Sequence, residues 1–218
     1  MKVIITGATG MVGEGVLHEC LLSNEVSEIL VVNRKECGIS HPKLKEIVHS
    51  NFFDLSVIEN HLTGYDGCFF CLGVSSVGMS ESDYTKMTFD LTMHVAETLV
   101  KHNKEMVFCY VSGSGTDGTE SGKIMWARVK GKTENHLMRM YFKKAYMFRP
   151  GLMRPTKGLK NTLKFYKAII WMYPMLKVLF PKFVCTLSEV GVAMIKSVSK
   201  GNDRSILEVQ DIVSLANE

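Results

Sequence analysis

Three glycines near the start of the chain have a spacing that suits the binding of a phosphate group. Gly7, Gly10 and Gly13 stand between an apolar run that predicts a strand and a stretch that predicts a helix. Glycines at this spacing allow a tight turn, a close approach of the backbone to a ligand, and helix-to-strand packing. The helix N-terminus adds unpaired N–H groups and a favourable dipole. We expect this loop to hold the pyrophosphate of a dinucleotide through Gly7, Thr9, Gly10, Met11, Val12 and Gly13.

A basic residue follows the second expected strand. A carboxylate at this point would bind the ribose 2′-hydroxyl of NAD. The chain has Arg34 there instead, and a guanidinium suits a 2′-phosphate because it forms paired, charge-assisted hydrogen bonds. We therefore predict NADP(H) in preference to NAD(H), with a solvated loop arginine as the alternative.

The glycine spacing differs from the G-x-G-x-x-G of two-domain dehydrogenases. Thr-Gly-x-x-Gly-x-x-Gly at 6–13 resembles the short-chain dehydrogenase/reductase superfamily, particularly its extended and atypical members with epimerase-like sequences. Ser-Gly-Ser-Gly-Thr-Asp at 112–117 and Arg-Val-Lys-Gly-Lys-Thr-Glu at 128–134 narrow the resemblance to the Tat-interacting-protein-like branch. The resemblance covers essentially the whole chain. It implies the fold and NADPH binding, and leaves the reaction open because the substrates of that branch are poorly defined.

The resemblance also implies further cofactor contacts. It places Asp54 at the adenine amino group and the segment 71–73 beneath the adenosine ribose. It also places a Pro-Gly segment against the nicotinamide carboxamide. Asp54 is equally suited to cap a helix, and a Pro-Gly pair forms a rigid turn in any case. The residues expected to contact the cofactor in this way are Phe53, Asp54, Cys71, Leu72, Gly73, Pro150, Gly151 and Leu152.

The catalytic residues implied by the resemblance are incomplete. Hydride-transferring members use a Ser, and a Tyr-x-x-x-Lys in which the Lys binds the nicotinamide ribose and lowers the pKa of the Tyr that exchanges the proton. Ser112 or Ser114 and Lys130 match, but Trp126 occupies the Tyr position. An indole cannot exchange a proton with a substrate oxygen at neutral pH. The proton would then come from one of the serines, from Tyr84 or from water linked to Lys130, although packing is the commoner role for such a tyrosine.

Two functional hypotheses follow. The first is an NADP-dependent oxidoreductase or epimerase-like enzyme that acts on a small carbonyl or hydroxyl compound. The second is a regulator or scaffold that binds NADPH without turning it over, and Trp126 is the residue that favours it.

The elements that must position these residues alternate between strand and helix. Near-continuous apolar strands separated by helices predict a parallel sheet covered on both faces, a doubly wound α/β Rossmann fold. We expect one domain over 1–218, with a core at 1–150 and a small C-terminal substrate cap that returns one late strand towards the sheet. The expected strands are 2–6, 28–32, 46–49, 67–72, 106–111, 145–148 and 206–209, and the expected helices 12–22, 57–62, 81–102, 124–141 and 188–198.

The net charge of +4 is unevenly distributed along the chain. Residues 123–182 contain fifteen Lys or Arg and one acid, Glu134, whereas the rest has eleven bases and twenty-one acids. A basic half attracts cofactor phosphates, an acidic substrate, a membrane or nucleic acid, although solvated helix faces account for most of these lysines. No nucleic-acid motif accompanies the charge, so we expect a small-molecule substrate and no nucleic acid.

A basic and aromatic segment, 162–183, has two interpretations. It could rest on a membrane surface or line a pocket for a bulky substrate. A cap packed on its own domain is the commoner arrangement, and we favour it over membrane contact.

Cysteine usage and the N-terminus bear on metal binding and location. Cys68 and Cys71 have redox or metal spacing, but they lie in a predicted strand with no second Cys/His pair, so we expect buried thiols and no metal. No signal-peptide pattern is visible, and the longest apolar stretch, 168–180, is interrupted by Pro174 and Lys177. We expect a cytoplasmic monomer or homodimer.

Overall fold

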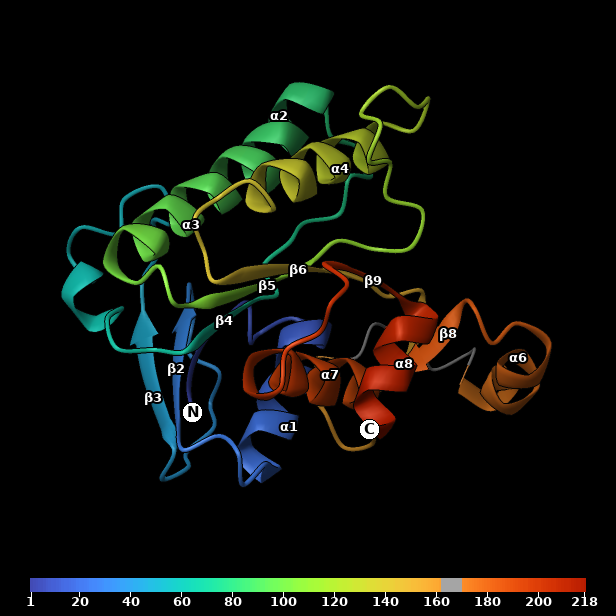
Figure 1. Ribbon diagram of the computed structural model, residues 1–218, viewed down its shortest axis with the longest axis horizontal. Helices are drawn as coiled ribbons and strands as arrows, with labels where there is room; N and C mark the ends of the chain where they lie inside the picture. The colour runs from blue at the N-terminus through green and yellow to red at the C-terminus, as the bar shows by residue number, and fades with distance from the viewer. Residues whose placement is uncertain (162–169) are drawn as a thin grey trace.

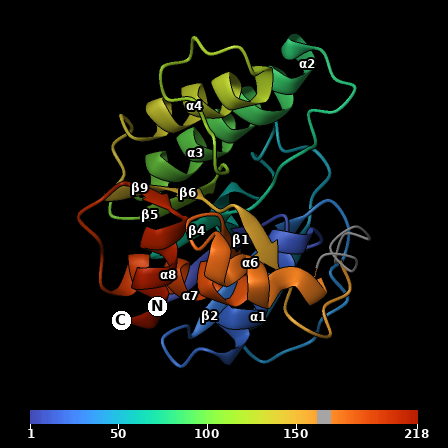
Figure 2. The same ribbon diagram turned by 90° about the vertical axis from the view of Figure 1, so that its right-hand side faces the viewer.

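A computed structural model describes residues 1–161 and 170–218, and the first part of the basic, aromatic segment, 162–169, lies outside the described residues. Seven parallel strands form the central sheet (Figures 1 and 2) in the order β3-β2-β1-β4-β5-β6-β9. The order reverses between β1 and β4, which makes the sheet doubly wound and confirms the predicted fold class. The strands are β1 (Lys2–Thr6), β2 (Glu28–Asn33), β3 (Leu44–Val48), β4 (Gly67–Phe70), β5 (Val107–Val111), β6 (Lys144–Arg149) and β9 (Ile206–Glu208).

Helices cover both faces of this sheet, as Figure 1 shows above and below the strands. One layer contains α2 (Glu81–Thr85), α3 (Leu91–His102) and α4 (Met125–Leu137), with a π-helical segment, η2 (Lys86–Asp90), joining α2 to α3. The opposite layer contains α1 (Met11–Leu22), α7 (Leu187–Ser199) and α8 (Val209–Asn217), with α7 packed against both α1 and α8. Each layer encloses its own buried apolar cluster.

The central strands are apolar on both faces because both faces are covered. Val3, Ile4 and Ile5 of β1 are all buried, as expected for the middle of a parallel sheet. Ile5 pairs with Val31 of β2 on one side and with Phe69 of β4 on the other. The carboxyl ends of these strands therefore meet at one edge of the sheet.

The part after residue 150 differs from the expected arrangement. Two strands of three residues each, β7 (Leu152–Arg154) and β8 (Val184–Thr186), form a separate parallel pair that was too short to predict. The 3-10 turn η3 (Ile170–Met172) and helix α6 (Tyr173–Leu179) precede β8, and α6 lies at the outer right of Figure 1. By contrast, α7, β9 and α8 complete the layers of the Rossmann core.

Several predicted elements are shorter than expected, among them the helix predicted over 124–141, which ends at Leu137. The helix predicted over 57–62 is only a 3-10 turn, η1 (Glu59–His61), because so short a segment gains too few hydrogen bonds to offset the cost of starting an α-helix. The strand predicted over 67–72 ends at Phe70, and the next two residues instead run against the glycine loop.

Candidate active site

The glycine loop is a cradle that a side chain would fill. Gly7 has φ +74°, and a Cβ there would lie 2.8 Å from the carbonyl oxygen of Cys71. A Cβ on Gly13 would lie 2.2 Å from the Gly7 carbonyl oxygen, so the first turn of α1 packs directly on the loop. Thr9 and Gly10 are exposed above it. Backbone N–H groups at a helix N-terminus, with no Cβ in the way, are suited to a pyrophosphate.

Asn33, at the end of β2, fixes this loop and was missed by the sequence analysis. Its buried side chain accepts a hydrogen bond from the Ala8 N–H, 3.0 Å from Oδ1. Its Nδ2 donates to Glu46 Oε1 at 3.2 Å, and the Cys37 N–H donates to the same oxygen at 2.9 Å. The amide thus ties the glycine loop to β3 and to the loop that carries Arg34. A polar residue ending an otherwise apolar strand was the available signal.

Arg34 lines the same small cavity as Phe53 and Leu72, two of the residues that the resemblance places near the adenosine. Arg34, Phe53, Leu72 and Met87 line a cavity of about 70 Å³. The Arg34 side chain is exposed, and none of the described residues forms an ion pair or hydrogen bond with it. The cavity is smaller than an adenosine, so it marks a hollow beside Arg34 and does not enclose a ligand.

The Asp54 carboxylate organises a turn. It accepts hydrogen bonds from the Ser56 hydroxyl at 2.6 Å and the Ser56 N–H at 3.1 Å, which lower the pKa of Asp54. No α-helix begins here, so the helix-capping alternative is wrong. The adenine contact of Asp54 stays a prediction.

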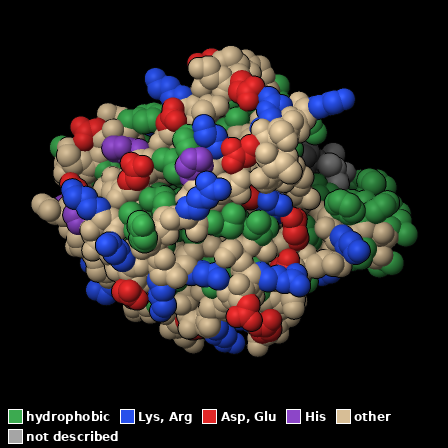
Figure 3. Space-filling view, turned by 45° about the horizontal axis from the view of Figure 1, so that its top comes forward, with side chains coloured by type: hydrophobic (Ala, Val, Ile, Leu, Met, Phe, Trp, Pro, Cys, Tyr) green, Lys and Arg blue, Asp and Glu red, His purple; other side chains and the backbone are tan. Residues whose placement is uncertain are grey.

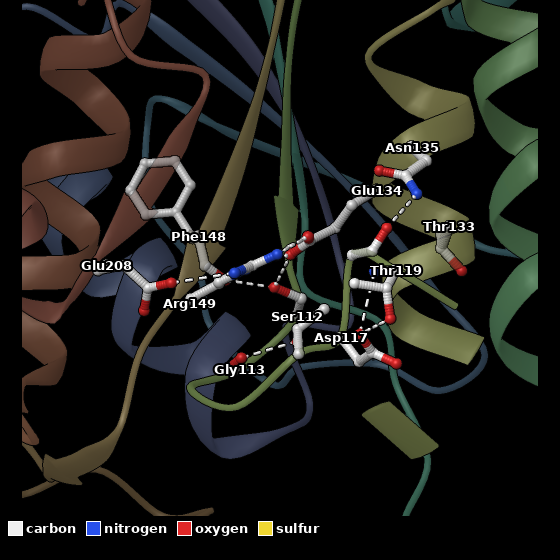
Figure 4. A network of polar contacts seen from close by, with 12 residues as sticks. Ser112, Gly113, Asp117, Thr119, Thr133, Glu134, Asn135, Phe148, Arg149 and Glu208 are labelled. Atoms are coloured by element: carbon white, nitrogen blue, oxygen red, sulfur yellow. Dashed lines mark hydrogen bonds and ion pairs between the residues drawn. The ribbon is translucent and has the colours of Figure 1, made fainter. Parts of the chain in front are cut away.

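The Ser112 hydroxyl is buried in an ion-pair network (Figure 4). It donates to Glu134 Oε1 at 2.5 Å and lies 3.1 Å from the Phe148 carbonyl oxygen. Glu134 is fully buried, and Arg149 holds it with Nε 3.0 Å from Oε1 and Nη2 2.5 Å from Oε2. Arg149 also donates through Nη1 to Glu208 Oε1 at 3.0 Å. The charge and hydrogen bonds of Glu134 raise the pKa of Arg149.

Because the Ser112 hydroxyl is engaged in this network, the Ser114 hydroxyl is better placed than that of Ser112 to contact a substrate. Its side chain is half-buried, and none of the described residues forms a hydrogen bond with its hydroxyl. Its N–H donates to the Pro150 carbonyl oxygen at 2.9 Å. This bond joins the Pro-Gly segment to the loop over residues 112–117, which we call the serine loop.

The Pro-Gly segment is held from its other side as well. The Leu152 N–H donates to the Phe183 carbonyl oxygen at 2.8 Å, and a Cβ on Gly151 would lie 2.2 Å from that oxygen. The ends of β4, β5 and β6 and the glycine loop after β1 are thus gathered at one edge of the sheet. This is the edge at which open α/β sheets bind their ligands.

Lys130 and Trp126 reach the serine loop from α4. The Lys130 ammonium donates to the Ser112 carbonyl oxygen. Burial lowers the pKa of Lys130 to about 8, against the opposing charge of Glu134. Trp126, one turn earlier on the same helix face, lies beside Gly115, where a Cβ would be 3.7 Å from the ring atom Cη2. The indole thus borders the serine loop at the position where the resemblance puts a tyrosine.

Tyr84 has the environment of a packing residue. Its side chain on α2 is only 2% exposed, and burial raises the pKa of its hydroxyl. The packing interpretation is therefore favoured over a proton donor.

The cysteines are free thiols rather than a disulfide or a cluster. Cys68 and Cys109 are buried, which raises the pKa of both thiols. Within residues 1–161 and 170–218, no group of His, Cys, Asp or Glu side chains is arranged to hold a metal ion.

Comparison with known proteins identifies the family. Residues 3–131 match the NAD dependent epimerase/dehydratase family. The chain belongs to this family. The matched region contains the glycine loop, the serine loop and Lys130, so the chain has the NAD(P)-binding, oxidoreductase-type fold of its members.

Individual relatives agree with the resemblance seen in the sequence. The chain is 25% identical to protein FMP52 of Eremothecium gossypii over 227 residues, covering 100% of this chain and 98% of that protein. It is also 25% identical to protein HTATIP2 of Rattus norvegicus, covering 70% of this chain and 62% of that protein. Among solved structures, the Bordetella bronchiseptica enzyme WbmF in complex with NAD+ superposes with a TM-score of 0.66 at 15% identity, covering 99% of this chain and 76% of that chain. The resemblance to the epimerase-like, Tat-interacting-protein-like branch is confirmed.

One expectation is contradicted by these relatives. We predicted a cytoplasmic location because no signal-peptide pattern is visible. The FMP52 relatives are named mitochondrial, so the expectation of a cytoplasmic location does not stand.

Proposed function

We propose that the chain binds NADP(H) in preference to NAD(H) and uses it to reduce or oxidise a small carbonyl or hydroxyl compound. The glycine cradle suits the pyrophosphate, and the small cavity beside Phe53 and Leu72 borders the region where the adenosine would lie. Arg34 supports the preference because its exposed guanidinium follows β2, at the point where a carboxylate would bind the 2′-hydroxyl of NAD.

The catalytic proposal rests on one observation: the Lys130 ammonium donates a hydrogen bond to the Ser112 carbonyl oxygen in the serine loop. When bound, the nicotinamide supplies or accepts a hydride. Lys130 holds the nicotinamide ribose, and the Ser114 hydroxyl donates a hydrogen bond to the substrate oxygen. A lysine with a pKa of about 8 exchanges protons readily at neutral pH, so Lys130 supplies the proton that a tyrosine provides elsewhere in the superfamily. Trp126 forms the apolar wall of the site.

Turnover measurements on Ser114→Ala test this assignment. NADPH absorbance is followed with a panel of aldehydes and ketones, and turnover is expected to fall by about a hundredfold or more. Ser199→Ala, at an exposed serine that ends α7, is the control and retains full turnover. Undiminished turnover in Ser114→Ala would contradict the assignment.

Trp126 supports a second candidate function, an NADPH-binding regulator without turnover. The test is Trp126→Tyr, which restores the tyrosine of the superfamily four residues before Lys130. Turnover in this variant, combined with none in the natural protein, would favour the regulator. Turnover in the natural protein that is lost in Lys130→Ala would favour the enzyme.

We also propose that the chain is one domain and that the substrate cap is confined to β7, α6 and β8. The solved neighbours bind small molecules, including UDP and UDP-glucose, which supports a small-molecule substrate of this site.

A further inference from the structure

A row of large apolar side chains projects from the segment around α6. Trp171, Met175, Val178 and Leu179 recur at the spacing of one helix face, and each is more than half exposed. Phe180 and Phe183 extend the row towards β8 and are also more than half exposed. Figure 3 shows hydrophobic side chains gathered at its right, where Figure 1 places α6. We call these six residues the α6 patch.

The α6 patch is not the inward face of the helix. The inward face is provided by Tyr173, which is buried and stacks against Arg154 at 4.8 Å, and by half-buried Leu176. A surface helix of a globular protein normally turns polar residues outward. A helix that is apolar on both sides, with the outer side in a contiguous exposed patch, indicates that a partner covers the outer side.

The charge around the patch favours a negatively charged partner. Lys177 and Lys182 lie within the segment and are exposed, and Arg154 and Lys157 are exposed near β7. From residue 135 to residue 188 the sequence contains eleven Lys or Arg and no acid. Glu189 Oε1 lies 3.5 Å from Lys177 Nζ and offsets part of this charge.

We propose that the α6 patch rests on the surface of a phospholipid bilayer that contains anionic lipids. Trp171 and the phenylalanines enter the boundary between head groups and acyl chains, where amphipathic aromatic side chains are favoured. The lysines contact lipid phosphates and carry their apolar stems along the same surface. The contact is peripheral, and among the described residues no helix is long and apolar enough to cross a membrane. A second copy of the chain fits less well, because a symmetric contact would bring two basic surfaces together.

Vesicle binding tests the proposal on the full chain. Flotation is measured with vesicles of phosphatidylcholine alone and of phosphatidylcholine mixed with phosphatidylserine, at low and high salt. We expect binding to the mixed vesicles that weakens as salt rises, because exposed charges are screened. The fluorescence of Trp171 shifts to the blue on binding, and the shift disappears in Trp171→Phe.

Two valines provide a matched pair of variants. Val178 in the patch is 79% exposed and Val57, far away in the sequence before η1, is 75% exposed. Val178→Glu is expected to weaken vesicle partitioning by about tenfold or more, since it places a carboxylate in the apolar boundary next to anionic lipid. Val57→Glu leaves partitioning unchanged, and thermal melts check that both variants fold.

Several results would overturn the proposal. Absence of binding to both kinds of vesicle would do so, as would equal losses in the two valine variants. A natural dimer that Val178→Glu converts to a monomer, without any vesicle binding, would assign the patch to a second copy of the chain.

Discussion

Two opposing effects act on the Lys130 ammonium, and the balance between them sets its pKa. Burial disfavours its charged form, whereas the negative charge of Glu134, one turn later on α4, favours it. The result is a lysine with a pKa of about 8, held at the Ser112 carbonyl oxygen. Because the pKa is depressed, Lys130 is charged below pH 8 and neutral above it.

This titration predicts the pH dependence of cofactor binding. We expect the affinity for NADPH to fall as the pH rises through about 8, because the neutral amine loses the charge that attracts the ribose-phosphate region. Fluorescence titrations across this range measure the effect. Lys130→Met should bind NADPH more weakly and with a flat pH profile, and the same break near pH 8 in that variant would assign it to another group.

The two carboxylates that bind Arg149 predict unequal effects on stability. Glu134 is fully buried, whereas Glu208 is half exposed. Removal of Glu134 leaves the largely buried Arg149 guanidinium with only the half-exposed Glu208 as counter-charge, so Glu134→Gln is expected to lower the free energy of unfolding by about 3 kcal/mol. Glu208→Gln should cost about 1 kcal/mol or less, since solvent screens the exposed pair. Urea denaturation compares the two variants, and equal losses would contradict a structural role for the buried pair.

At the scale of elements, the site depends on loops joined across neighbouring strands. The Asn33 amide joins the glycine loop to β3, and the Ser114 N–H joins the serine loop to the segment after β6. Loops that carry function are usually positioned by such a rigid scaffold.

Asn33→Ala tests this coupling. It leaves the Ala8 N–H without its buried acceptor, and we expect a loss of about 1–3 kcal/mol in the free energy of unfolding together with weaker NADPH binding. Asn24→Ala, at an exposed asparagine, is the control and should change stability by no more than about 0.5 kcal/mol. Unchanged NADPH affinity in Asn33→Ala would show that the glycine loop keeps its shape without the amide.

The sequence was informative where the pattern is local. The apolar strands, the glycine spacing and the long helices could be predicted because each depends on neighbours a few residues away. The contacts of Asn33, and the burial of Glu134 against Arg149, could not, since they join residues that only the sheet brings together. The same limit explains β7 and β8, whose three residues each contain too little of a repeating pattern. Glu134 could nevertheless have been singled out from the sequence, because it is the one acid in the basic stretch 123–182.

At the scale of the whole molecule, one edge of the sheet gathers the proposed site. The glycine loop, the Arg34 cavity, the serine loop and the Pro-Gly segment all follow strands of one parallel sheet. A parallel sheet places these strand ends on the same side, so residues from 7 to 152 can contact one extended ligand. The α6 patch is on the outer side of the cap, which β7 and β8 join to this edge, and its exposed side chains can serve a different partner.

The most direct test of the account is a comparison of NADPH and NADH binding by fluorescence titration. The natural protein is expected to bind NADPH more tightly than NADH by about tenfold or more, because Arg34 can form charge-assisted hydrogen bonds with the 2′-phosphate. Arg34→Ala should remove most of this difference, whereas Lys35→Ala, at the exposed neighbour, should retain it. NADH binding as tight as NADPH binding in the natural protein would contradict the proposed NADP(H) site.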